Sequence, residues 1–209
     1  MSINILGKTY DIDSRKICIN NSLVKEIPEN LTIFTNLQIL SLALNQIKKI
    51  PNNFTNLVNL KRLDISYNKI KEIPYSFCNL INLQELDLSN NEIKEIPNNF
   101  SNFIHLKMLF LENNQIMYIP ISIMSLKNLI TFYHHDNQIE NINPIIQRFL
   151  QRINDRGQNI HNIYNDKQNI HASSIQKSVK DSIIKIFSCD IKNIEFNIPW
   201  FYFSCRILL

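Results

Sequence analysis

The densest group of side chains able to do acid–base or metal chemistry is the run Tyr133-His134-His135-Asp136. A histidine beside an aspartate can act as a general base or as a metal ligand. In a strand, however, successive side chains point to opposite faces, and His134 stands where a core leucine is expected. His134 and His135 therefore cannot serve as paired ligands. The run predicts a structural role, with no metal site, no cofactor and no catalytic residue.

A second group of titratable residues lies further along the chain. His161, Asp166 and His171 could meet in one loop, but no serine or cysteine accompanies them as a nucleophile. The cysteines form no CxxC pair and lie far apart, which predicts thiols in a reducing compartment. They are Cys18, Cys78, Cys189 and Cys205.

The composition excludes several classes of protein. The 209 residues include two glycines, Gly7 and Gly157, so no glycine-rich loop for a dinucleotide or nucleotide phosphate can be built. The net charge of +4 comes from 22 basic and 18 acidic residues without a run of five like charges, which argues against nucleic acid as partner. Because no signal-like start and no long apolar stretch is present, we expect a cytoplasmic protein without a membrane span.

An internal repeat must position these residues. The chain reads LKRLDISYNKIKEIPYSFCNLIN from Leu60 and LQELDLSNNEIKEIPNNFSNFIH from Leu83. Similar copies start at Leu37, Leu106 and Leu129, and a divergent first copy starts at Ser14 with Ser22 in place of asparagine. Five asparagines recur at a constant step of 23 and form the predicted structural ladder: Asn45, Asn68, Asn91, Asn114 and Asn137.

Each copy predicts a brief strand followed by a turn. Alternating aliphatic residues such as Leu63 and Ile65 favour a strand, and Pro74 ends it because proline has no backbone donor. One copy cannot bury its apolar residues alone, so the copies must stack around one core. The buried asparagine amides would satisfy backbone groups, and we expect Phe54, Phe77 and Phe100 to form an aromatic row. We interpret the other asparagines as a compositional bias.

The pattern LxxLxLxxNxIxxIPxxFxxLxx resembles the leucine-rich repeat in its 23-residue intracellular form. The resemblance implies an α/β fold: a right-handed solenoid with a concave parallel sheet and a helical C-terminal cap. We assign residues 1–13 to an N-terminal cap, 14–144 to six repeats and 145–209 to a C-terminal cap and extension.

The two ends should cover the core that a stack exposes. A hairpin around Gly7 is expected at the start, and Pro144 should begin a helix that lies over the last repeat. A second helix is expected from Ser173, followed by an aromatic tail over 198–209 that is buried, contacts a partner or membrane surface, or is a non-native ending. Residues 164–176 resemble a segment that follows the repeats in proteins of giant DNA viruses, which implies a viral protein in the host cytoplasm.

The concave face is the expected binding surface, because its strand side chains stand side by side. Adjacent carboxylates at Asp64 and Asp87 invite a basic group, although they could simply be usual residues of such repeats. Met108, Phe110 and Tyr133 form an apolar patch, which the C-terminal segment could instead cover. The candidate partner-binding residues are Asp64, Tyr67, Glu85, Asp87, Met108, Phe110, Glu112, Tyr133 and His135.

These features predict a protein–protein interaction module that binds a protein partner and acts as a non-catalytic adaptor. A second hypothesis makes the repeats the substrate-recognition part of a ubiquitin-ligase-like effector, with Cys189 or Cys205 as acceptor. Reactive cysteines need exposed, electropositive surroundings, whereas Cys205 lies in an apolar run. A third is self-association through the aromatic tail. The partner's identity and the oligomeric state are left open.

Overall fold

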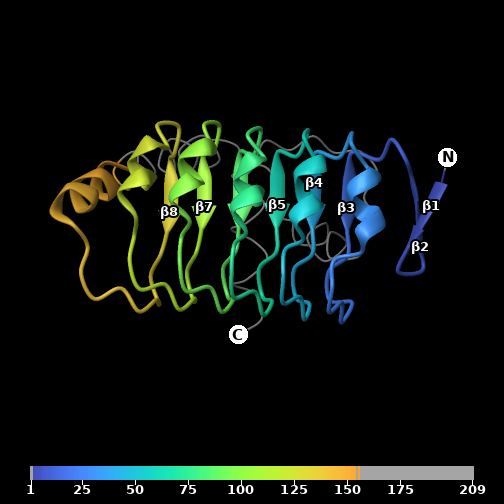
Figure 1. The fold of residues 1–209 in the computed structure, drawn as a ribbon, viewed down its shortest axis with the longest axis horizontal. Helices are drawn as coiled ribbons and strands as arrows, with labels where there is room; N and C mark the ends of the chain where they lie inside the picture. Colours follow the sequence, from blue (N-terminus) through green and yellow to red (C-terminus); the bar gives the residue numbers. More distant parts are fainter. Residues whose placement is uncertain (1, 154, 156–209) are drawn as a thin grey trace, which may run out of the picture. The chain divides into compact units, whose positions relative to one another are not determined.

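The repeats build one parallel sheet in the computed structural model, which describes residues 2–153 and 155 (Figure 1). Six strands pair in chain order, each in parallel register with the next. Their middle residues, such as Leu63 and Leu86, are completely buried, while the first and third residues point the other way. The strands are β3 (Lys16–Cys18), β4 (Ile39–Ser41), β5 (Arg62–Asp64), β6 (Glu85–Asp87), β7 (Met108–Phe110) and β8 (Thr131–Tyr133).

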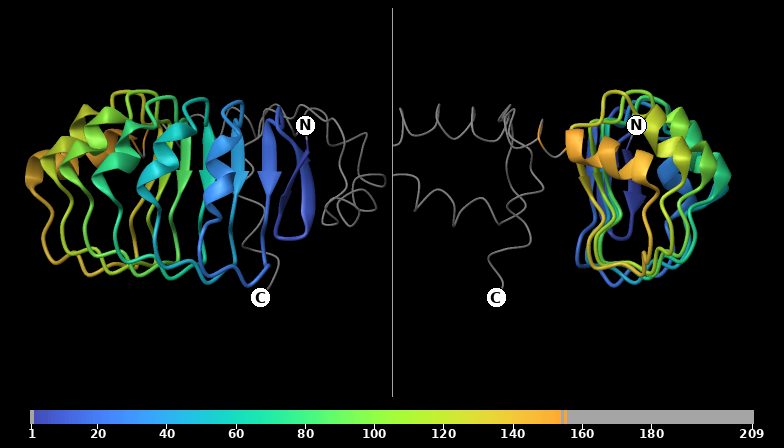
Figure 2. Two further views of the ribbon diagram at one scale, coloured as in Figure 1. Left: turned by 45° about the vertical axis from the view of Figure 1, so that its right-hand side comes forward. Right: turned by 90° about the vertical axis from the view of Figure 1, so that its left-hand side faces the viewer.

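The side opposite the sheet consists of short 3-10 helices (Figure 2). A proline with φ between −61° and −72° precedes each of them, and its carbonyl accepts the first hydrogen bond of the turn. Proline thus ends the extended segment and starts the turn. The helices are η1 (Glu29–Ile33), η2 (Asn52–Asn56), η3 (Tyr75–Asn79), η4 (Asn98–Asn102) and η5 (Ile121–Ser125).

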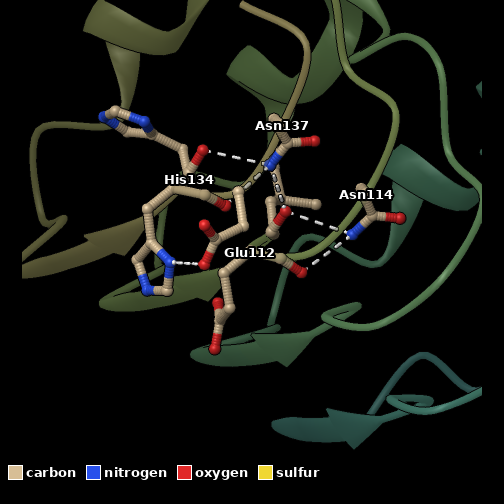
Figure 3. Close-up of polar contacts among 7 residues, drawn as sticks. Glu112, Asn114, His134 and Asn137 are labelled. Carbon is tan, nitrogen blue, oxygen red and sulfur yellow. Dashed lines mark hydrogen bonds and ion pairs between the residues drawn. The ribbon is translucent and has the colours of Figure 1, made fainter.

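The five asparagines at the step of 23 occupy equivalent positions between the sheet and the following segment. The Asn91 amide donates to the carbonyls of Ile65, Leu88 and Ser89 at 3.0–3.2 Å, and its Oδ1 accepts from the backbone N–H of Ile70 at 3.0 Å. Asn114 and Asn137 repeat this pattern (Figure 3). Each side chain therefore joins its own repeat to the preceding one.

The first repeat, which has no ladder asparagine, depends on the second. The backbone N–H groups of Ser22 and Val24 both donate to Asn45 Oδ1 at 3.0 Å. Ser22 turns its hydroxyl to the carbonyl of Asn20 at 2.9 Å.

A second asparagine column corrects our compositional interpretation for three of the remaining asparagines. The amide groups of Asn59, Asn82 and Asn128 donate to the carbonyls of Thr35, Val58 and Ile104, each 24 residues earlier, at 2.6–2.8 Å. These exposed turns are therefore also tied from repeat to repeat. The spacing was visible in the sequence, but His105 interrupts it.

The aromatic row of Phe54, Phe77 and Phe100 is present and includes one further ring, Phe103. Phe54 and Phe77 stack at 6.3 Å, and Phe103 then contacts both Phe77 and Phe100 edge to face at 5.8 Å and 5.1 Å. Phe103 occupies a position that is leucine in neighbouring repeats, so the pattern did not indicate an aromatic contact there.

The N-terminal end is covered by a hairpin of β1 (Ser2–Ile5) and β2 (Lys8–Asp11). Leu6 and Gly7 turn the chain with φ of 51° and 82°, a conformation that glycine adopts without steric cost. Ile5 belongs to the buried core, and the Tyr10 ring meets Phe34 edge to face at 6.4 Å.

A helix over residues 144–153 follows the last repeat, with Pro144 at its first position as expected. Asn143 Oδ1 accepts from the N–H of Ile145 at 2.9 Å, which caps this end. Ile146, Leu150 and Ile153 join the same core cluster as the repeats. The expected second helix from Ser173, the segment 164–176 and the tail 198–209 lie outside the described residues.

One backbone feature recurs in every repeat just after the strand. The residues there have φ between 49° and 57°, in the left-handed region that asparagine tolerates best among non-glycine residues. Two repeats instead place a large apolar side chain there, Leu44 and Tyr67, which are 49% and 36% exposed. The six positions are Asn21, Leu44, Tyr67, Asn90, Asn113 and Asp136.

We predict that Asn91→Ala lowers the free energy of unfolding by at least about 3 kcal/mol, because several buried backbone groups lose their partners together. Chemical denaturation of both proteins measures this difference. Asn53→Ala, at an exposed position in η2, is the control and should change stability by less than about 0.5 kcal/mol. Equal effects of the two substitutions would contradict the role of the ladder.

We also predict that Leu44→Asn raises the free energy of unfolding by about 1 kcal/mol, since a branched side chain is strained at positive φ. The reverse change in the equivalent position, Asn90→Leu, should lower it by a similar amount. Thermal and urea denaturation would measure both variants. A loss of stability in Leu44→Asn would show that packing of the leucine outweighs the backbone strain.

Candidate functional site

The outward side of strands β3–β8, called here the strand face, is the surface that the sequence predicts to be concave. The parallel register places Asp64 beside Asp87, Arg62 beside Glu85, and Phe110 between Asp87 and Tyr133. Six of the nine candidate residues lie on the strands, and Tyr67, Glu112 and His135 follow β5, β7 and β8 at the edge of this face. The structure thus brings the six strand residues together on neighbouring strands, as alternation predicts.

The candidates differ in exposure. Tyr67 and His135 are exposed, while Asp64, Met108, Glu112 and Tyr133 are half-buried. Glu85, Asp87 and Phe110 are 8%, 7% and 3% exposed. Counting alternate strand residues did not indicate this difference, because it depends on the size of the side chains on adjacent strands.

The two aspartates are held by the serines that follow them. Ser89 donates from both its backbone N–H and its hydroxyl to Asp87 Oδ1, at 2.9 Å and 2.7 Å. Ser66 holds Asp64 in the same way, and the Ser41 hydroxyl donates to Asp64 Oδ2 at 3.1 Å. The carboxyl groups are therefore fixed in place before any partner arrives.

Ionisation of this pair is unfavourable. Burial raises the pKa of Asp64, and burial together with the neighbouring Asp64 carboxyl raises the pKa of Asp87 well above 3.8, with a smaller contribution from Glu112. The folded protein therefore binds more protons than the unfolded chain between pH 3.8 and the raised pKa. Because of this difference, the free energy of unfolding falls as the pH rises through that range, and ionisation of Asp87 lowers stability there.

Two glutamates flank the aspartates. Glu85 Oε1 forms an ion pair with Arg62 Nε at 3.1 Å, yet burial still raises the pKa of Glu85. The Oε2 atoms of Glu85 and Glu112 are buried without a hydrogen-bond partner. Figure 3 shows the Glu112 carboxylate directed away from the asparagine ladder.

The aromatic candidates form a contact of their own. The Phe110 and Tyr133 rings meet edge to face at 5.4 Å, and Tyr133 lies 6.1 Å from the His135 ring. Phe110 is buried in this arrangement, so the expectation that it offers an accessible anchor is corrected. Tyr133 is the more accessible of the two rings.

The histidine run divides between two environments. His134 is half-buried with its ring 5.0 Å from the core residue Phe132, and burial lowers its pKa. His135 is exposed, and its Nδ1 lies 2.6 Å from Asp136 Oδ2. Within the described part of the chain, no group of three or more histidine, cysteine, aspartate or glutamate side chains could hold a metal ion.

The remaining described residues that could react or bind a ligand do not form a second candidate site. Cys78 is a buried thiol whose pKa burial raises to about 12, which makes it a poor nucleophile. A hollow of about 250 Å³ is lined by the polar residues Asn59, Lys61, Asn82, Gln84 and His105, none of them a candidate. Cys189, Cys205 and the group His161, Asp166 and His171 lie outside the described residues.

Three further residues of this surface, which strand alternation also places on the concave side, are not among the nine candidates. Arg62 neutralises one oxygen of Glu85, and Ser66 and Ser89 orient the aspartates. The phrase Asp-x-Ser in two consecutive repeats was the available indication for the serines. Leu44 stood in the column of Asn90 and Asn113, where asparagine is the residue that suits the backbone.

Comparison with known protein families identifies leucine-rich repeats in this chain. Residues 35–93 match the family described as leucine rich repeat, and residues 81–122 match leucine rich repeats in two copies. No curated protein matches the chain.

Among solved structures, a leucine-rich repeat protein of Leptospira interrogans is 30% identical with a TM-score of 0.61, over 68% of this chain and 35% of that one. An internalin from Listeria monocytogenes is 25% identical with a TM-score of 0.59, over 68% and 39%. The chain thus spans well under half the length of both.

A third similar structure is the leucine-rich repeat ectodomain of a plant membrane receptor kinase from Arabidopsis thaliana, in complex with Casparian strip integrity factor 2. It is 26% identical with a TM-score of 0.55, over 61% of this chain and 16% of that one.

No helix in residues 2–153 and 155 has the length and apolar character needed to cross a membrane.

Four observations indicate the same fold: the 23-residue register, the asparagine ladder, the family matches and the structural neighbours. The repeats of this chain form a leucine-rich repeat solenoid, and residues 35–122 match leucine-rich repeat families.

Proposed function

We propose that the strand face binds a protein partner and that the protein acts as a non-catalytic adaptor. Six strands at about 4.8 Å spacing extend over roughly 24 Å, which suits a contact of about 800 Å² per partner. Leucine-rich repeat domains generally mediate protein–protein interactions, and the similar plant receptor-kinase ectodomain is in complex with Casparian strip integrity factor 2.

One observation carries this proposal. Tyr67 is exposed at the edge of the strand face and has a positive φ, although asparagine occupies the same position in two later repeats. Backbone strain of this kind concentrates at functional sites, and tyrosine is a common anchor in interfaces. Tyr67 costs stability where it stands, and a contact with a partner would offset that cost.

The cellular location and the origin of the protein are also part of this proposal. We place the protein in a reducing cytoplasm, which four widely spaced cysteines without a CxxC pair support. The resemblance of residues 164–176 to a segment in proteins of giant DNA viruses supports a viral origin and the host cytoplasm.

We predict that Tyr67→Ala/His135→Ala loses its partner while remaining folded. Both side chains are exposed on the strand face, so their loss should reduce capture of the partner at least about tenfold. Affinity capture from cell lysate, quantified by mass spectrometry, would compare this variant with the wild type, and circular dichroism would confirm the fold.

The chain offers a matched control in Tyr75→Ala/His105→Ala. These residues are of the same types and are exposed, but Tyr75 begins η3 on the opposite side and His105 lies in a turn. The proposal requires proteins that are captured by the wild type and the control and are lost by the strand-face variant. Capture of the same proteins in equal amounts by all three would refute it.

A further inference from the structure

The strand face carries more carboxyl groups than cations. Asp64, Asp87 and Glu112 lie on three consecutive repeats, and Glu85 precedes Asp87 on the same side of β6. Arg62 forms an ion pair with Glu85. Four carboxyl groups and one guanidinium leave a formal charge of −3 when all are ionised, and Lys107 adds one positive charge close enough to lower the pKa of Glu85.

The arrangement shows carboxylate oxygens without donors. Glu85 is 8% exposed, and its Oε2 is buried without a hydrogen-bond partner while Oε1 binds Arg62. Glu112 Oε2, on the next repeat, is also buried without a partner. Buried polar atoms in folded proteins nearly always have partners. Within residues 2–153 and 155 neither oxygen has a donor, which indicates that a further donor completes the group.

The donor best suited to this group is a cationic side chain. The described residues include no set of three side chains arranged to hold a metal ion. Asp64 and Asp87 instead stand on adjacent strands, about 4.8 Å apart. The planar guanidinium of arginine presents five donors in a fork, which can bridge two neighbouring carboxylates.

We infer that the protein partner presents a basic segment, with an arginine side chain that enters between Asp64 and Asp87. This rests on the proposed function of the strand face and specifies the chemistry of the partner. The arginine would neutralise carboxylates that repel one another, so the same residues that reduce stability in the isolated protein would strengthen binding. Exposed Leu44 and Tyr67, at the edge of the face, would contact apolar residues beside the arginine.

Fluorescence anisotropy with the 209-residue chain tests this inference. The probes are labelled hexa-arginine, hexa-lysine and hexa-glutamate peptides at about 0.15 M salt, where weak long-range attraction is screened. We expect hexa-arginine to bind most tightly and hexa-glutamate not at all. Asp64→Asn/Asp87→Asn should weaken hexa-arginine binding at least about tenfold, and its denaturation midpoint at pH 7 should equal or exceed that of the wild type.

The control is Glu72→Gln/Glu95→Gln, which removes the same charge from exposed, equivalent positions of two adjacent repeats outside the strand face. Binding by this variant should stay within about twofold of the wild type, since remote surface charges are screened. If Asp64→Asn/Asp87→Asn is unstable, Glu112→Gln provides a second variant with the same expected direction.

Three results would overturn the inference. They are no binding of hexa-arginine to the wild type, equal losses of binding in the control and strand-face variants, and no loss of binding in either variant. If Tyr67→Ala/His135→Ala loses its partner from lysate while Asp64→Asn/Asp87→Asn retains it, the proposed function stands and the basic partner is refuted.

Discussion

The structure depends on hydrogen bonds between each ladder asparagine and the repeat before it. A 23-residue unit buries little on its own, so it is stable only when backbone groups at the turn after each strand find partners in a neighbouring unit. The Asn68 amide donates to Leu42, Ile65 and Ser66, and its Oδ1 accepts from Ile47. Five such side chains hold the strands in register, and the strand face follows from that register.

The same regular stacking places groups that reduce stability next to one another on the strand face. Parallel stacking without offset places equivalent residues of consecutive repeats side by side, so the phrase Leu-Asp-x-Ser brings Asp64 and Asp87 together. The serine hydrogen bonds fix each carboxyl group but do not neutralise it, and burial opposes its ionisation. Leu44 and Tyr67 add backbone strain at the edge. Stability is thus reduced where the face offers aromatic, apolar and acidic groups to a partner.

Much of the fold could be predicted because the 23-residue period determines the phase of every repeat. Once Asn45 and Asn68 are aligned, positions 23 residues apart are equivalent. This equivalence predicts the inward leucines, the strands and the residues that neighbour Asp64. The 3-10 turns, the contact of Phe103 with two rings and the burial of Phe110 could not be counted in this way, because they depend on side-chain volumes across repeats. The spacing of the second asparagine column, Asn59, Asn82 and Asn128, is visible in the sequence, but a compositional bias explains it equally well without the structure. Whether the nine candidate residues bind a partner remains a prediction.

Site-specific photo-crosslinking in cells tests the central claim, that the strand face contacts a protein, most directly. A benzoylphenylalanine group would replace Tyr67 on the strand-face edge in one protein and Tyr75 at the start of η3 in another. Both positions are exposed tyrosines, so the probe is the same and only the surface differs. We expect a discrete crosslinked protein from position 67 and none from position 75. Crosslinking from position 75 alone would contradict binding through the strand face.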